Sequence, residues 1–269
     1  MKYITHPKGY TIVELLVVIT VMGVVAISAI GVIGNQQART ELPHSVRDFE
    51  AKLLDVANDT ARGYYPDTGQ AGEGRTCLAS GSGISFTSDV SVQGGSRDCV
   101  FAGKALAFAP DGEVGEFAVL TVAARRLTRD DNPATSLADF SSGDIAVADH
   151  LNTSLQLLYG LQVKSVTYAG ADVGALVFMS GFSNQEQRSG GVQLSGAPQT
   201  NLLAITGTSV GSALSVTQSA ISGLQFNEVT NDEGIVICLQ RGDGGETAEV
   251  TVGKDGRLLT TTAEFKVAC

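Results

Sequence analysis

Residues 10–34 read YTIVELLVVITVMGVVAISAIGVIG, a long apolar run in which Glu14 is the only charged residue. An α-helix formed by this run would be about 37 Å long at ~1.5 Å per residue, which is enough to cross the ~30 Å hydrocarbon layer of a membrane with some tilt. A carboxylate in such a segment costs about 2.5 kcal/mol or more to insert. We therefore expect Glu14 to be a functional residue that has a partner.

A short polar segment, MKYITHPKG at residues 1–9, precedes the apolar run and carries Lys2 and Lys8. A secretory signal peptide has a shorter apolar stretch that is followed by a small-residue cleavage site, whereas here the small residue, Gly9, comes before the run. An ordinary membrane anchor is the alternative interpretation. Such an anchor gains nothing from a carboxylate one turn inside its polar end.

Three features resemble the type IV prepilin signal: a short basic leader ending at Gly9, an aromatic residue at Tyr10, and Glu14 four positions further on. The resemblance implies that a prepilin peptidase removes residues 1–9 and that the new N-terminus, Tyr10, is N-methylated. It also implies a single-pass membrane protein, which an inner-membrane assembly platform later builds into an extracellular or periplasmic filament. Most members of the family have Phe at the position of Tyr10.

Glu14 also has a physical reason to take part in assembly. Cleavage after Gly9 would leave a free α-amino group on Tyr10, so that a cation and the Glu14 anion would both lie in apolar surroundings. Pairing Glu14 with the amine of a neighbouring subunit replaces two poorly solvated charges by one hydrogen-bonded pair. The family resemblance implies the same role, with the helix contacting lipid before assembly and other pilin subunits afterwards.

Helical periodicity continues after residue 36, where the composition turns polar. Positions that step by three or four residues line one face, namely Leu42, Val46, Phe49, Leu53, Val56 and Thr60. Pro43 either kinks a continuous helix or begins a second one, and Gly63 is a favourable helix stop. The pattern predicts a helix over residues 10–62 that is apolar in its first half, amphipathic in its second half, and packed on a β-sheet.

Residues 63–269 show no second long helical pattern, and they are rich in Gly and turn signals. Strand-like runs occur at 84–87, 99–102, 105–109, 116–127, 155–168, 175–180, 202–206, 213–216, 234–240, 248–252 and 257–261. These features predict an extracytoplasmic, antiparallel β-rich globular domain. The expected fold class is therefore α+β, with a long N-terminal helix packed on this domain.

The four cysteines are Cys77, Cys99, Cys238 and Cys269, and none belongs to a C-x-x-C pair. Because the chain has only three His, we expect neither a metal site nor a cofactor. The even count and wide spacing favour two disulfides formed outside the cytoplasm, with buried free thiols as the alternative. More than one pairing is open, and we favour Cys77 with Cys99 and Cys238 with Cys269 because each closes a local segment.

The C-terminal part carries a second resemblance. An apolar run at 235–238 ends in Cys238, a glycine-rich turn and the sequence Asp-Gly-Arg at 255–257 follow, and Cys269 is the last residue. This order resembles the GspH/FimT family of minor pilins and pseudopilins. The resemblance favours a minor pilin, or a pseudopilin of type II secretion, over a compact major pilin.

The net charge and the short sequence motifs argue against nucleic-acid binding and against enzyme activity. The net charge of −10 becomes −12 when Lys2 and Lys8 leave with the leader, which argues against general nucleic-acid binding. A G-x-S-x-G pattern occurs at 207–211, but no His follows Ser209, and we predict that the chain is not an enzyme.

Three alternatives stay open: a tip adhesin, a DNA-uptake subunit and a membrane-anchored enzyme exported as a pilin. Arg125, Arg126 and Arg129 form the only basic cluster in the sequence that DNA uptake could use.

Overall fold

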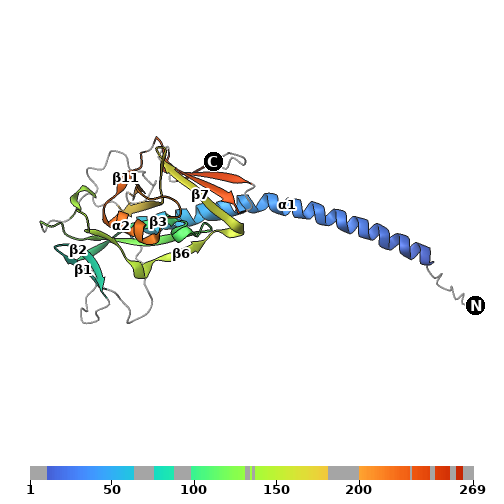
Figure 1. The fold of residues 1–269 in the computed structure, drawn as a ribbon, viewed down its shortest axis with the longest axis horizontal. Helices are drawn as coiled ribbons and strands as arrows, with labels where there is room; N and C mark the ends of the chain where they lie inside the picture. Colours follow the sequence, from blue (N-terminus) through green and yellow to red (C-terminus); the bar gives the residue numbers. More distant parts are fainter. Residues whose placement is uncertain are drawn as a thin grey trace, which may run out of the picture. The chain divides into compact units, whose positions relative to one another are not determined.

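The computed structural model describes residues 11–63, 76–87, 98–130, 134, 137–180, 200–230, 232–242, 246–254 and 259–262. The chain divides into two compact units, Met1–His44 and Ser45–Cys269. Figure 1 colours the ribbon along the sequence, from the N-terminal helix in blue to the C-terminal strands in red.

The long helix α1 spans Ile12–Ala61. It runs continuously through Pro43, so that the proline does not begin a second helix. The helix ends where the sequence predicts, because Gly63 adopts a left-handed conformation (φ 65°) and its N–H bonds the carbonyl of Thr60. By hydropathy, no helix within the described residues is long and apolar enough to span a membrane.

The second unit is built from antiparallel strands, as the sequence predicts. Within the described residues, one sheet has seven strands in the order β11-β10-β9-β3-β4-β5, with β6 also pairing with β4. Its strands are β3 (Cys99–Phe108), β4 (Glu116–Arg125), β5 (Ile145–Val147), β6 (Thr153–Gln156), β9 (Ala175–Ser180), β10 (Thr200–Ile205) and β11 (Phe226–Glu228).

A second sheet has five described strands in the order β14-β13-β12-β7-β8, and a hairpin of β1 and β2 stands apart. The strands of the second sheet are β7 (Leu161–Tyr168), β8 (Ala171–Asp172), β12 (Ile235–Arg241), β13 (Thr247–Val252) and β14 (Leu259–Thr262). The hairpin consists of β1 (Thr76–Ser80) and β2 (Gly83–Thr87). The architecture is therefore α+β, with most of the second unit in antiparallel sheets.

Helices cover both faces of the seven-stranded sheet. The ring of Phe49 on α1 packs on the rings of Phe108 and Phe117, with centroids 6.5 and 5.7 Å away. The short helix α2 (Leu214–Ser222) packs on the opposite face, where Ile221 shares a buried cluster with Ala107. Residues 107 and 108 point to opposite faces because successive side chains alternate along a strand.

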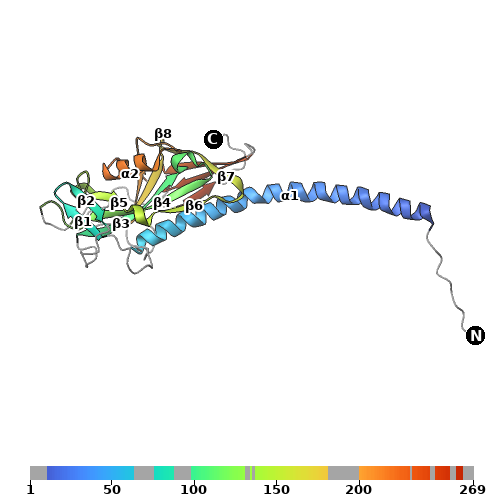
Figure 2. The ribbon, with the colours of Figure 1, turned by 60° about the horizontal axis from the view of Figure 1, so that its bottom comes forward.

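Two lysines fasten residues 45–61 of α1 to the seven-stranded sheet. Lys52 Nζ bonds the carbonyl of Gln156 at 2.9 Å, and Lys104 Nζ lies 2.7 Å from an Asp59 carboxylate oxygen. Figure 2 shows this part of α1 running beside β4 and β6. The polar contacts fix the helix along the sheet in addition to its apolar packing.

The side-chain hydroxyl of Tyr168 links the two sheets. Tyr168 on β7 donates its O–H to the carbonyl of Glu228 on β11 at 2.9 Å and accepts the N–H of Thr230 at 3.1 Å. Because β7 and β11 belong to different sheets, these two bonds hold one sheet against the other.

Two predictions about the strands are wrong. The run 155–168 does not form one strand, because a 3-10 helix at Leu158–Gly160 separates β6 of the seven-stranded sheet from β7 of the five-stranded sheet. Residues 213–216 begin helix α2 instead of forming a strand. Short apolar runs do not distinguish a strand from a buried helix, and here the buried side chains Thr217, Ala220 and Ile221 follow helical spacing.

Candidate functional site

The first turn of α1 holds Glu14 in a capping box with Thr11. The N–H and the O–H of Thr11 both donate to Glu14 Oε2, at 3.0 and 3.1 Å, and the N–H of Glu14 donates to Thr11 Oγ1 at 3.3 Å. Each residue thus satisfies a backbone N–H at the start of the helix that has no partner within the helix. The sequence pattern T-x-x-E at residues 11–14 is the known signal for this arrangement, and our sequence reasoning missed it.

Apolar side chains surround Glu14 along the helix. Twelve large apolar residues between 12 and 27 are each at least 55% exposed, namely Ile12, Val13, Leu15, Leu16, Val17, Val18, Ile19, Val21, Met22, Val24, Val25 and Ile27. They lie on all sides of the helix, since consecutive positions are included. An exposed apolar surface of this kind needs lipid or other helices around it.

The other polar side chains of this segment are satisfied inside the helix. The hydroxyls of Thr20 and Ser28 donate to the carbonyls of Leu16 and Val24, each four residues back. Glu14 is the only ionisable residue between positions 11 and 28. Any electrostatic partner of this helical segment must therefore act on Glu14.

The predicted cleavage and methylation residues, Gly9 and Tyr10, lie outside the described residues, so their roles stay predictions. Cys77 on β1 and Cys99 on β3 form a disulfide, which fastens the β1–β2 hairpin to the seven-stranded sheet. Cys238 is buried on β12, and Cys269 lies outside the described residues, so the second pairing also stays a prediction.

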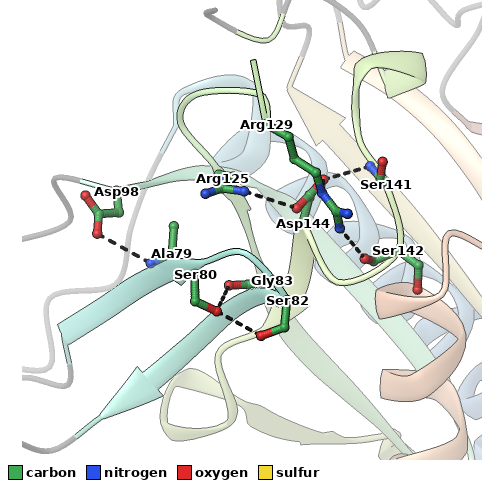
Figure 3. A network of polar contacts seen from close by, with 10 residues as sticks. All are labelled: Ala79, Ser80, Ser82, Gly83, Asp98, Arg125, Arg129, Ser141, Ser142 and Asp144. Carbon is green, nitrogen blue, oxygen red and sulfur yellow. Dashed lines mark hydrogen bonds and ion pairs between the residues drawn. The ribbon is translucent and has the colours of Figure 1, made fainter. Parts of the chain in front are cut away.

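Two arginines of the predicted basic cluster, Arg125 and Arg129, form ion pairs within the domain (Figure 3). Arg125 Nη1 and Arg129 Nε lie 3.8 and 3.4 Å from the two carboxylate oxygens of Asp144, whose side chain is 2% exposed. The N–H of Ser141 donates to the same carboxylate at 2.9 Å. Two of the three arginines therefore neutralise a buried acid, which weakens the case for phosphate binding here.

The G-x-S-x-G pattern and the possible metal ligands were the other candidate sites in the sequence. Ser209 lies in the loop between β10 and α2, and its N–H bonds Ser212 Oγ at 3.0 Å. In the part of the chain that the structure describes, no group of three or more His, Cys, Asp or Glu could hold a metal ion. The loop holds Ser209 five residues before α2, whereas a nucleophile elbow requires a sharp strand-to-helix turn.

Comparison with known proteins gives one finding. Residues 5–30 match the family model of the prokaryotic N-terminal methylation motif, the leader signature of type IV pilins. Neither the curated proteins nor the solved structures provide a match to this chain. The matched segment contains Gly9, Tyr10 and Glu14 together with the apolar first half of α1. The chain thus carries, over about its first tenth, the methylation motif of type IV pilin-like proteins.

Proposed function

We propose that this protein is a minor structural subunit of a type IV pilus or a related pseudopilus. The observation that carries the proposal is the apolar surface of α1 from Ile12 to Ile27, directly inside the matched methylation motif. Such a surface is suited first to membrane lipid and then to a bundle of identical helices in a filament core. The function is assembly, and no catalytic step is assigned to the chain.

Leader removal prepares the subunit for assembly. A prepilin peptidase cleaves between Gly9 and Tyr10, and the new N-terminal residue is methylated. Residues 10–62 form the N-terminal helix, whose apolar first part anchors the subunit in the membrane, while residues 63–269 form the extracytoplasmic domain. The inner-membrane assembly platform then moves the subunit from lipid into the growing filament.

Glu14 registers each incoming subunit. It is the only ionisable residue between positions 11 and 28, so it offers the one electrostatic contact that two such helical segments can share. The methylated amine of Tyr10 keeps its positive charge and is the complementary group. Their pairing in an apolar environment is a charge-assisted hydrogen bond, about twice as strong as a neutral one.

The pseudopilus form of this proposal is a pseudopilin of type II secretion. The hairpin of β12 and β13 carries Cys238 and corresponds to the part of the chain that resembles GspH/FimT proteins, a resemblance that fits a minor pilin and a pseudopilin equally. A tip adhesin remains compatible with the large β domain. DNA uptake is less favoured, because Arg125 and Arg129 already pair with Asp144.

Substitution of Glu14 tests the assembly function. We expect Glu14→Ala and Glu14→Leu to remain in the membrane fraction but to be depleted from sheared filaments, measured by immunoblotting both fractions. Thr20→Val is the matched control, because it also removes a polar group from the helix but one that is bonded internally. Normal incorporation of both Glu14 variants would refute the assembly role.

A further inference from the structure

Strand β11 forms one edge of the seven-stranded sheet, and among the described strands it pairs only with β10. Just beyond β11, the N–H of Val229 donates to the carbonyl of Leu202 on β10 at 3.0 Å. Because peptide groups alternate in direction along a strand, the backbone groups of residues 226, 228 and 230 point away from β10. These outward groups, the outer edge of β11, are of the kind on which a further strand can pair.

The hydroxyl of Tyr168 lies where the next strand would lie. It donates to the carbonyl of Glu228 at 2.9 Å and accepts the N–H of Thr230 at 3.1 Å, so it satisfies one outward acceptor and one outward donor. Tyr168 is 8% exposed, whereas Glu228 and Thr230 are exposed residues. An added strand would need both backbone groups and the space that the end of the Tyr168 ring fills.

The opposite edge of the same sheet is closed in a similar way. The N–H of Leu157 donates to the carbonyl of Gly115, directly before β4, at 2.9 Å. The carbonyl of Gln156 belongs to the same peptide group as this N–H and therefore points outward. Lys52 Nζ on α1 donates to that carbonyl at 2.9 Å. At each edge, a side chain from outside the sheet thus occupies an outward carbonyl, as expected where edge strands are protected from pairing.

We propose that Tyr168 is a protective contact at an edge strand: it keeps the outer edge of β11 from pairing with the same edge of a second copy of this chain. A second copy is the partner that fits, because pairing needs another strand with unsatisfied outward groups and every copy carries this one. The inference goes beyond the proposed function and does not depend on it, since it concerns only the folded domain.

Three variants separate the edge contact from a general loss of stability. Tyr168→Phe removes only the hydroxyl, whereas Tyr168→Val also removes the ring and keeps a strand-forming residue. Val166→Ala is the matched control, because it removes volume from a buried apolar side chain on the same strand. Glu228→Pro in the Tyr168→Val background is the rescue variant, because the N–H that it removes points outward and the bonds to β10 remain.

The measurement is hydrogen–deuterium exchange of the β11 segment in the full chain at rising protein concentration. Excess detergent is used so that α1 does not bring copies together. At low concentration, we expect the Thr230 amide to exchange about five-fold faster in both Tyr168 variants, because its acceptor is lost. At high concentration, the outward amides of Tyr168→Val should become protected as copies pair. The wild type, Tyr168→Phe and Val166→Ala should show no such dependence on concentration.

Three results overturn the inference. The first is a Tyr168→Val chain whose exchange does not slow with concentration. The second is an equal slowing in Val166→Ala, because lost stability would then explain both. The third is unchanged protection after Glu228→Pro is added, because the pairing would then not use the edge of β11. If circular dichroism shows that Val or Pro disrupts the fold, Tyr168→Leu and Asn227→Lys replace them, and the same three criteria apply.

Discussion

Replacing Gly103 by Ala tests the close approach of two central strands in the seven-stranded sheet. Gly103 follows a bulge in β3 and pairs with Met179 of β9. A Cβ atom at Gly103 would lie 2.0 Å from the carbonyl oxygen of Phe178 and 2.9 Å from the Cα of Met179. Both atoms belong to the β9 backbone, so neither can move aside by a change of rotamer.

The expected cost follows from these distances. Overpacking a core costs about 1–3 kcal/mol and occasionally more, and a contact of 2.0 Å with backbone belongs at the upper end. Gly→Ala also stabilises a protein by about 0.4–1 kcal/mol through the unfolded chain. We therefore expect Gly103→Ala to lower the free energy of unfolding by about 2–3 kcal/mol.

Gly115→Ala is the matched control. The nearest atom to its added Cβ is the carbonyl oxygen of Leu161 at 3.9 Å, an ordinary van der Waals distance. Both variants share the unfolded-state effect of Gly→Ala, so the difference of about 3 kcal/mol between them reports the clash. At about 2–4 °C per kcal/mol for a domain of this size, Gly103→Ala should melt roughly 6–12 °C below Gly115→Ala.

The assay is pulse proteolysis of the detergent-solubilised protein across a urea series, because the chain has no Trp for fluorescence. Circular dichroism melts supply the corresponding Tm values. Equal urea midpoints for the two variants would show that β9 moves away from β3 at little cost. Such a result would refute the inference that Gly103 is required by the close approach of the strands.

Three further predictions concern the same domain. Tyr168→Phe removes the hydroxyl that links the two sheets, so we expect a loss of about 1–2 kcal/mol in the urea series, and an unchanged midpoint would show that the link is dispensable. Burial raises the pKa of the Glu50 carboxyl above its usual value, although Arg47 opposes this, so the native state loses stability as the pH rises through that raised pKa. Glu50→Gln should then be more stable than the wild type at neutral pH but not at pH about 3.5, and an equal gain at both would contradict the assignment to burial. Replacing Cys77 and Cys99 together by Ser should lower the free energy of unfolding by about 3 kcal/mol, because the bridge closes a segment of 22 residues, and a double variant as stable as the wild type would count against this.

Long-range periodicity made the main elements predictable from the sequence. The periodicity predicts a helix over residues 10–62, and α1 spans Ile12–Ala61; Gly63 ends it with the left-handed conformation that glycine favours. Helix α2 was not predicted, because residues 213–216, its N-cap and first turn, are also compatible with a strand. A window of this length contains too few turns for a helical period to show.

The polar contacts were harder to predict, for two different reasons. The pairing of Arg125 and Arg129 with Asp144 joins residues that only the folded sheet brings together. No local sequence pattern therefore predicts this pairing. The capping box does have a local signal, because Thr11 and Glu14 are three positions apart in the sequence. The same glutamate also stands out as a charge in an apolar segment, which by itself gives no indication of a partner at Thr11.

The N-terminus of the mature protein reports whether the chain is processed and assembled as a pilin. Mass spectrometry of the protein purified from its native membrane or filaments identifies the first residue and any modification on it. We predict a mature chain that begins at Tyr10 and carries one methyl group on its α-amino nitrogen. A mature chain that retains Met1 or starts at another residue would contradict the proposed processing and assembly.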